Sequence, residues 1–151
     1  MVFLLSRIKK DFIDFLAYYD DDKFVGFTYL ITEGDLTFIQ YIAVDSTLHS
    51  KGYGSAILSQ IKALYPNNRI ALNLEMLDEN AENTEQRIKR RAFYDKNGYE
   101  DTGIITDVHG NTLDTLILGG TTTVEELHVL LKKFTGVVFG LFAKYRFRYA
   151  D

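Results

Sequence analysis

The sequence predicts an α/β fold of the α+β type, in which helices flank a sheet of mixed strand direction. Three observations favour it. Aromatic-rich strand candidates fill the first third of the chain, strand and helix patterns alternate after them, and a second hairpin candidate lies near residue 110. Because no repeat, low-complexity run or linker interrupts the 151 residues, we expect one domain over residues 1–151.

The first third predicts a hairpin and then a buried strand. Residues 14–19 (DFLAYY) and 23–31 (KFVGFTYLI) flank three consecutive aspartates, which supply turn chemistry. Residues 36–44 (LTFIQYIAV) are almost continuously apolar, which is typical of a central strand covered on both faces.

The middle of the chain predicts a helix, a strand and a second helix. Apolar residues at helical spacing over 55–65 predict a helix that ends at the only proline. Residues 69–77 (RIALNLEML) alternate as a strand does. Asn83 with Gln86 three residues later predicts a capped helix start, and that helix runs to about residue 97.

The last third predicts a second hairpin, a helix and a strand. Residues 104–108 and 112–118 flank a His-Gly-Asn turn. From Thr123 an apolar stripe predicts an amphipathic helix. Residues 136–149 predict a final strand, whose end alternates basic and aromatic residues (KYRFRY).

Composition excludes several classes of function. The formal net charge of -4 and the pI near 5.4 argue against a nucleic-acid partner, which usually needs a basic face. The absence of Cys excludes disulfides and thiolate catalysis, and three scattered histidines give no metal-ligand pattern. The longest apolar stretch, 137–143, is shorter than the ~20 residues of a membrane helix. The start lacks the order of a secretory signal, so we expect a cytoplasmic protein with no membrane partner.

The segment 45–55 (DSTLHSKGYGS) carries the chemistry. A short loop between a buried strand and a helix directs backbone N–H groups into one hollow, and the helix dipole adds positive potential for an anion. Gly52 and Gly54 leave room for a phosphate, and Lys51 adds a cation. Taken alone, this pattern fits a tight turn without any ligand equally well.

Two motifs resemble one family. Residues 41–58, YIAVDSTLHSKGYGSAIL, resemble motif A of the GNAT superfamily of acetyl-CoA-dependent N-acyltransferases, whose loop reads Gln/Arg-x-x-Gly-x-Gly/Ala. Here His49 stands in the first position of that loop. Residues 93–99, FYDKNGY, resemble the Leu-Tyr-x-Lys-x-Gly-Phe of motif B. The resemblance covers about residues 24–118 and implies a mainly antiparallel central sheet.

The resemblance implies acetyl-CoA as co-substrate and no metal. The backbone at the end of the strand 36–44 would bind the pantetheine arm, and the following loop would bind the pyrophosphate. The implied cofactor-binding residues are Ile42, Ala43, Val44, His49, Ser50, Lys51, Gly52, Tyr53, Gly54 and Ser55.

The resemblance also implies direct attack of an amine on the thioester. Tyr94 matches the family's acid for the leaving thiolate, and the alternative is a core aromatic. For the base our first candidate is Glu75, which breaks an apolar alternation, although an exposed strand-end carboxylate is an equally good interpretation. Asp78, Glu79 and His109 are the reserve candidates.

Two departures from the family bear on function. Arg87 and Arg90 stand where family helices often carry Asn and Ala, so either they touch a phosphate or they form a solvated basic face. Family members also place a strand and one or two helices before the first hairpin, and we expect that wall of the acceptor cleft to be reduced. Alternatively a partner subunit, as in a homodimer, builds this wall, or the chain is a shortened form with impaired activity. Residues 121–151 would compensate by packing where the missing part would lie. The leading hypothesis is an N-acetyltransferase whose acceptor is a primary amine of a small molecule or peptide. The second hypothesis is a catalytically silent CoA-binding or interaction module.

Overall fold

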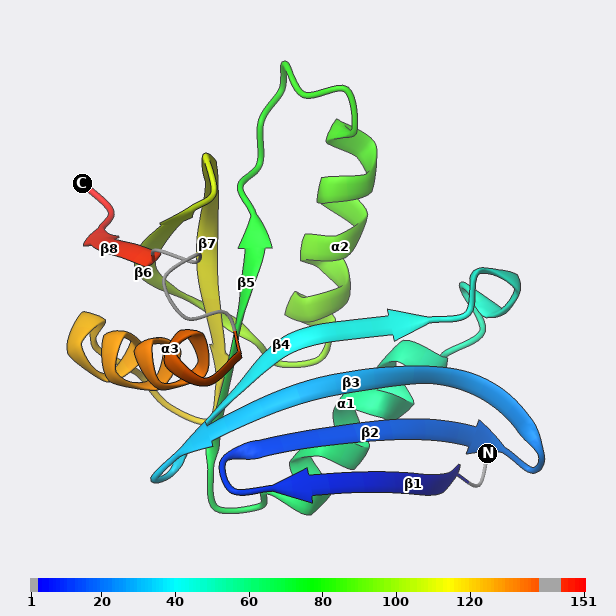
Figure 1. The fold of residues 1–151 in the computed structure, drawn as a ribbon. Coiled ribbons are helices and arrows are strands. Elements are labelled where there is room, and N and C mark those ends of the chain that lie inside the picture. The colour runs from blue at the N-terminus through cyan, green and yellow to red at the C-terminus, as the bar shows by residue number, and fades with distance from the viewer. Residues whose placement is uncertain (1–2, 139–144) are drawn as a thin grey trace. The chain divides into compact units, whose positions relative to one another are not determined.

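The computed structural model describes residues 3–138 and 145–151, which form two compact units, Met1–Ile70 and Ala71–Asp151. Both units combine antiparallel strands with helices, so the predicted α/β fold of mainly antiparallel strands and flanking helices is confirmed. Figure 1 shows the elements in chain order.

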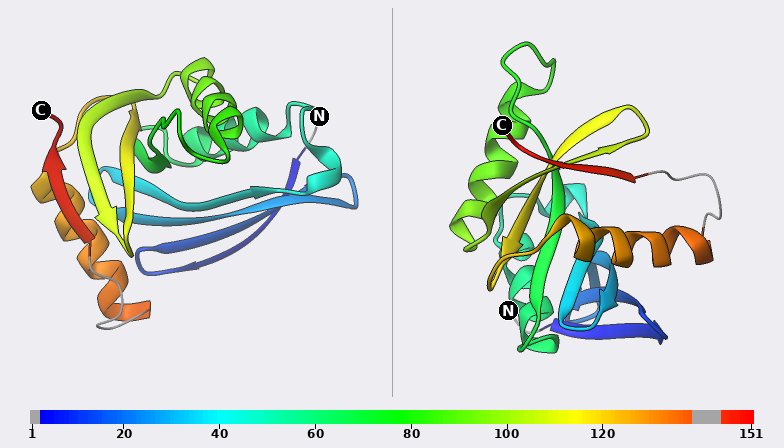
Figure 2. Two further views of the ribbon diagram at one scale, coloured as in Figure 1. Left: turned by 90° about the horizontal axis from the view of Figure 1, so that it is seen from above. Right: turned by 90° about the vertical axis from the view of Figure 1, so that its left-hand side faces the viewer.

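The first unit is a four-stranded antiparallel layer with one long helix against it. Its strands lie in the order β1-β2-β3-β4, each paired with the next in sequence. Figure 2 shows α1 lying along this layer. The elements are β1 (Phe3–Lys10), β2 (Ile13–Asp20), β3 (Lys23–Glu33), β4 (Leu36–Val44), a 3-10 turn (Ser46–Leu48) and α1 (Tyr53–Leu64).

Polar contacts fix both ends of α1 to β2. Alternate residues of β2 face inward, as the period of two of a strand requires, and Asp14 is only 1% exposed. The Tyr65 hydroxyl, just past the end of α1, donates to Asp14 Oδ2 at 2.6 Å. The Tyr53 hydroxyl, in the first turn of α1, donates to Asp20 Oδ2 at 2.7 Å. The helix therefore has a fixed position along the strand.

An ion pair between the buried Asp14 and the exposed Arg7 accompanies this contact. Arg7 of β1 donates to both oxygens of Asp14, from Nη2 at 2.6 Å and from Nε at 2.9 and 3.1 Å. A buried carboxylate is stable only when it is paired and hydrogen-bonded, and Asp14 meets both conditions. The hydrogen bond from Arg7 to Asp14 raises the pKa of the guanidinium above its ordinary value.

A β-bulge divides β4 into two halves. The register with β3 shifts between Tyr29 and Leu30, which leaves Gln40 as the extra residue on β4. Before the bulge, residues 36–39 are all buried; after it, residues 41–44 are exposed or half-buried, and Tyr41 is 59% exposed. The expectation that the whole strand is covered on both faces is therefore wrong for its second half.

The second unit holds the remaining strands in the order β5-β7-β6-β8 and two helices. Strand β6 pairs antiparallel with both β7 and β8. The first two residues of β5 belong to the first unit. The elements are β5 (Arg69–Glu75), α2 (Thr84–Lys96), β6 (Glu100–Val108), β7 (Asn111–Leu118), α3 (Val124–Val138) and β8 (Tyr145–Tyr149).

Salt bridges and rings attach the helices of this unit to its strands. Arg91 of α2 donates to Asp114 Oδ2 at 2.8 Å and to Asp101 Oδ2 at 2.7 Å, on β7 and β6. On α3, the ring of His128 lies 6.2 Å from the ring of Phe147 on β8. Specific side-chain contacts therefore join α2 to β6 and β7, and α3 to β8.

The predicted elements agree with these bounds at most positions. The segment 36–44 matches β4 from end to end, and the two predicted hairpins are β2–β3 and β6–β7. The strand β1 was not predicted. Residues 136–138, expected in a strand, belong to α3, and residues 145–149 of the same prediction form β8; residues 139–144 lie outside the described residues.

Asn83 precedes α2 as expected, but its side chain caps nothing. Its amide instead contacts Glu75 and Arg87, at 3.2 and 2.8 Å, because both side chains lie within reach of it. The predicted helix start is therefore right, although no side-chain hydrogen bond of Asn83 caps it.

Candidate functional site

In the first unit, the loop between β4 and α1 has the backbone of an anion site. Ser50 and Gly52 both have positive φ values, 64° and 82°. The first hydrogen bond of α1 runs from Ala56 N to Gly52 O at 3.1 Å, and the amides of a first helical turn point outward along the helix axis. No heavy atom lies within 4 Å of the place where a Cβ on Gly52 would stand, leaving its chain neighbours aside, so the space around this residue is open.

Side chains brace this loop from both ends. Asp45 accepts from Thr47 N at 2.9 Å and from Thr47 Oγ1 at 2.6 Å. The His49 ring nitrogen Nε2 lies 3.1 Å from Val44 O, so the imidazole contacts the end of β4. Tyr53 anchors the far end through Asp20. The loop is thus held in shape by its own residues, and an anion would find it already formed.

The end of β4 places its backbone beside a glycine of β3. Ile42, Ala43 and Val44 pair with residues 26–28 of β3. A Cβ on Gly26 would overlap the Ala43 carbonyl oxygen and lie 3.1 Å from Val44 Cα. Only glycine permits this approach, and the sequence analysis did not single it out. The segment predicted to hold pantetheine therefore depends on a residue of the neighbouring strand.

In the second unit, Glu75 stands at the end of β5 among basic and amide groups. Its carboxylate accepts from Arg90 Nη1 at 3.1 Å and from Asn83 Nδ2 at 3.2 Å, and Arg87 Nε lies 2.9 Å from Oε2. Partial burial acts to raise the pKa of Glu75, but the Asn83 hydrogen bond and the charges of Arg90 and Arg87 outweigh it and lower that pKa. Glu75 is therefore ionised at neutral pH and is a weak base.

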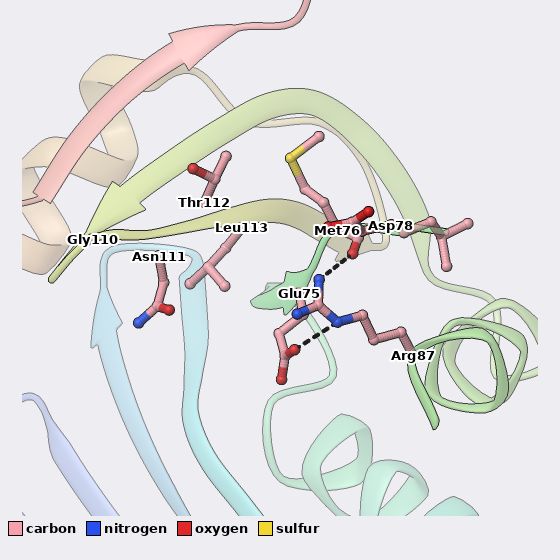
Figure 3. A pocket seen from close by; sticks show the side chains of 9 residues that line it. Glu75, Met76, Asp78, Arg87, Gly110, Asn111, Thr112 and Leu113 are labelled. Carbon is pink, nitrogen blue, oxygen red and sulfur yellow. Dashed lines mark hydrogen bonds and ion pairs between the residues drawn. The ribbon is translucent and has the colours of Figure 1, made fainter. Parts of the chain in front are cut away.

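A pocket of roughly 390 Å³ opens beside Glu75. Figure 3 shows Arg87 between Glu75 and the backbone of Met76, whose carbonyl accepts from Arg87 Nη1 at 2.9 Å. The pocket walls come from the end of β5, from α2 and from the β6–β7 hairpin; they comprise Glu75, Met76, Leu77, Asp78, Arg87, Gly110, Asn111, Thr112 and Leu113. Charged groups of both signs thus face one small space.

Tyr94 lies in a separate aromatic cluster. Its side chain is 6% exposed, and its ring contacts those of Phe93 and Tyr99 at centroid distances of 5.0 and 5.7 Å. Burial raises the pKa of Tyr94 to about 12, and the charge of Arg90 partly opposes this. Arg90 is therefore the neighbour that the Glu75 and Tyr94 clusters share.

The reserve candidates differ in position. Asp78 lines the pocket, where its carboxylate accepts from Asn80 N at 2.9 Å. Glu79 is exposed and does not line it. His109 is an exposed turn residue with φ 50°, next to Gly110 of the pocket wall. Among residues 3–138 and 145–151, no three His, Cys, Asp or Glu side chains form a group that could hold a metal.

Sequence reasoning missed three features of the site: the Gly26 contact, the Tyr53–Asp20 hydrogen bond, and the arginines around Glu75. The arginines left the clearest signal, because Arg87 and Arg90 are three residues apart and so share a helix face. Neither alternative of the sequence analysis, a phosphate contact or a plain solvated face, foresaw that both bind Glu75.

No helix in the described part of the chain combines the length and the hydropathy needed to span a membrane.

Comparisons with known proteins identify the family of this chain. The family model described as "Acetyltransferase (GNAT) domain" matches residues 11–101. No curated protein sequence matches the chain.

Solved structures show the fold. A GNAT-family acetyltransferase of Bacteroides thetaiotaomicron superposes with a TM-score of 0.62 at 16% identity, over 88% of this chain and 76% of that one. An acetyltransferase of Elizabethkingia anophelis with acetyl-CoA bound gives 0.56 at 13% identity, over 72% and 77%. The ribosomal-protein-S18-alanine N-acetyltransferase of Escherichia coli gives 0.57 at 17% identity, over 78% and 75%. With the family model covering more than half of its residues, this chain belongs to the GNAT family of acetyltransferases.

Proposed function

We propose that this protein transfers an acetyl group from acetyl-CoA to a primary amine of a small molecule or peptide. The single observation that carries the proposal is the preformed loop before α1, with positive φ at Ser50 and Gly52 and open space around Gly52. Such a loop suits a pyrophosphate, because backbone N–H groups and the helix dipole both favour an anion there. Structural neighbours with coenzyme A or acetyl-CoA bound support the same choice of co-substrate.

Ten residues named from the sequence, 42–44 and 49–55, would form this binding site. The backbone of Ile42, Ala43 and Val44, residues that are exposed or half-buried, would bind the pantetheine amides as it would bind an added strand. A backbone N–H near Ile42 would then polarise the thioester carbonyl. His49 contacts Val44 O and so would shape the loop rather than hold a phosphate directly.

Two side chains of the second unit would handle protons. Tyr94 would donate to the departing thiolate; it is fully protonated at neutral pH, because its pKa is about 12. Glu75 would attract the ammonium form of the acceptor and pass its proton to water. It cannot retain that proton, because its pKa is lowered by Asn83, Arg90 and Arg87.

The pocket beside Glu75 is the proposed acceptor site. Glu75 and Asp78 offer acceptors to an amine, while Met76, Leu77 and Leu113 offer apolar contacts. A cytoplasmic location and a homodimer remain predictions from the sequence, and light scattering on the purified protein would test the second.

The test combines binding and turnover. Calorimetric titration with acetyl-CoA should give one saturable site, and a panel of primary amines should then give acetyl-CoA-dependent thiol release. Desulfo-CoA would compete for the site without supporting the reaction. Absence of binding by the folded protein would contradict the whole proposal.

A second candidate function is a CoA-binding module without catalysis. The observation that favours it is Glu75, whose carboxylate is already engaged by Arg87 and Arg90. This function predicts the same calorimetric binding of acetyl-CoA but no thiol release with any amine. It also predicts that Tyr94→Phe causes no loss of that binding.

A further inference from the structure

The pocket beside Glu75 has more positive charge at one wall than Glu75 can neutralise. The Glu75 carboxylate lies 2.9 Å from Arg87 Nε and 3.1 Å from Arg90 Nη1. Two guanidinium groups therefore face one carboxylate, and this cluster keeps an excess positive charge. Arg87 lines the pocket and Arg90 does not. An acceptor whose only charged group is an ammonium makes no use of this positive charge.

Arg87 is held by its neighbours in a fixed orientation. Its Nε donates to Asn83 Oδ1 at 2.8 Å, and its Nη1 donates to Met76 O at 2.9 Å. In Figure 3 the third nitrogen, Nη2, points away from Glu75 and Met76, toward Leu113 of the pocket wall. Nη2 donates to no described residue. A guanidinium that other contacts already orient loses little freedom when it binds a carboxylate.

Asp78 supplies a group of opposite charge to the same pocket. Its Oδ1 accepts from Asn80 N at 2.9 Å, which orients the carboxylate. Its Oδ2 accepts from no described residue. The pocket therefore offers a donor for an anion, on Arg87, and an acceptor for a cation, on Asp78, that the described residues leave unused.

We propose that the acceptor is a small zwitterion, an amino acid or a compound like one. Its carboxylate pairs with Arg87 Nη2, and its ammonium pairs with Asp78 beside Glu75. Arg87 is then a specificity-determining residue, because it distinguishes an amine that carries a carboxylate from one that does not. The inference rests on the proposed function, under which this pocket is the acceptor site.

The size and the apolar part of the pocket fit such a molecule. Its volume of roughly 390 Å³ is near the lower end of the range of about 300–1,000 Å³ that is common for ligand pockets. Met76, Leu77 and Leu113 line it and would contact an apolar side chain of the amino acid. The expected acceptors are therefore amino acids with apolar side chains.

The first measurement compares acceptors with and without the carboxylate. Alanine, valine, leucine, methionine and phenylalanine are each titrated by calorimetry beside the corresponding amide, which keeps the amine and the side chain. We expect at least one amino acid to bind about ten-fold or more tighter than its amide, because the amide cannot form the ion pair with Arg87. Equal affinities within every pair, or no binding of any of these amino acids at millimolar concentration, would overturn the inference.

Variants show whether Arg87 causes that preference. In Arg87→Gln the Kd values of the acid and the amide should agree to within about two-fold. Arg90→Gln is the matched control, because it also removes an arginine from Glu75 but leaves the pocket wall intact, and it should keep the preference. Comparing ratios between enzymes cancels the different basicity of amino acids and amides. An equal ratio in the two variants would contradict the role of Arg87.

Asp78→Asn tests the other contact without disturbing the surroundings of Arg87, because Asp78 is exposed. Acid and amide both carry the ammonium, so this variant should weaken both by a similar factor, roughly two- to ten-fold. Unchanged affinity for both would remove the proposed ammonium contact and overturn the assignment of a zwitterion.

Turnover separates this inference from the proposed function. With acetyl-CoA present, thiol release should show the same preference for the acid over the amide in kcat/KM. Selective binding through Arg87 without thiol release would contradict the proposed function and keep the assignment of a zwitterion to the pocket. Thiol release at equal kcat/KM for acids and amides would keep the proposed function and contradict this inference.

Discussion

Glu75 shows how the surroundings of a single residue limit its chemistry. Three donors surround its carboxylate and lower its pKa, so it stays ionised far below neutral pH. Because the pKa of Glu75 lies below its ordinary value of 4.5, lowering the pH should not protonate Glu75 until the pH falls below about 4.5. The deprotonated form is the one that the proposed function uses. Any rate loss between about pH 5 and 7 should therefore be the same in the unmodified enzyme and in Glu75→Gln.

The same substitution should lower kcat/KM for the amine by about a hundred-fold, because the carboxylate that receives the ammonium proton is gone. The Kd for acetyl-CoA, measured by calorimetry, should stay the same. Glu79→Gln is the control, since Glu79 is exposed and does not line the pocket. Equal kinetics of the two variants would remove Glu75 from the mechanism.

At the scale of elements, β4 can lie this close to β3 only because Gly26 has no side chain. Gly26→Ala places a Cβ against the Ala43 carbonyl, so either β3 or β4 must shift. We expect a loss of about 1–3 kcal/mol in the free energy of unfolding, and weaker acetyl-CoA binding. Gly34→Ala, in the β3–β4 turn with φ 58° and open space around it, should cost only about 1 kcal/mol and leave the Kd unchanged. Urea unfolding and calorimetry decide, and unaltered binding by Gly26→Ala would separate this contact from the site.

The two ends of α1 permit a matched pair of variants. Tyr53→Phe frees the N-terminal end from Asp20 and should raise the Kd for acetyl-CoA roughly two- to ten-fold. Tyr65→Phe frees the other end from the buried Asp14 and should lower stability by about 1–3 kcal/mol without changing that Kd. Similar effects of both variants on binding would mean that α1 moves as a whole rather than at its loop end.

At the scale of the whole molecule, buried phenols limit stability at high pH. Burial raises the pKa of Tyr18 and of Tyr94 to about 12 and also raises that of Tyr99. Their folded pKa values lie above the ordinary value near 10, so their contribution is complete below about pH 10 and is lost as the pH rises toward 12. The urea midpoint should therefore fall steeply over that range. Tyr18→Phe should make the fall shallower, and a midpoint that is flat to about pH 12 would contradict the assignment.

How far the sequence reaches depends on the range of each interaction. The bounds of β4 were predictable, because turn residues and a run of apolar side chains are local signals. Strand β1 was not, since the role of Arg7 becomes clear only when register brings it to Asp14. In the candidate site, the glycine loop and Tyr94 are predictions from their motifs. The environment of Glu75 was not, because its partners come from a helix 8 to 15 residues further along the chain.

The bulge at Gln40 has a wider consequence for the molecule. On one side of it, four residues of β4 belong to the core; on the other, four residues present themselves to the outside. Substitutions at residues 36–39 should therefore change mainly the stability of the fold. Substitutions at residues 41–44 should change mainly the binding proposed for this strand end. Under the proposed function, this strand therefore keeps folding and co-substrate binding on separate residues, so the half proposed to bind tolerates substitutions that the core half does not.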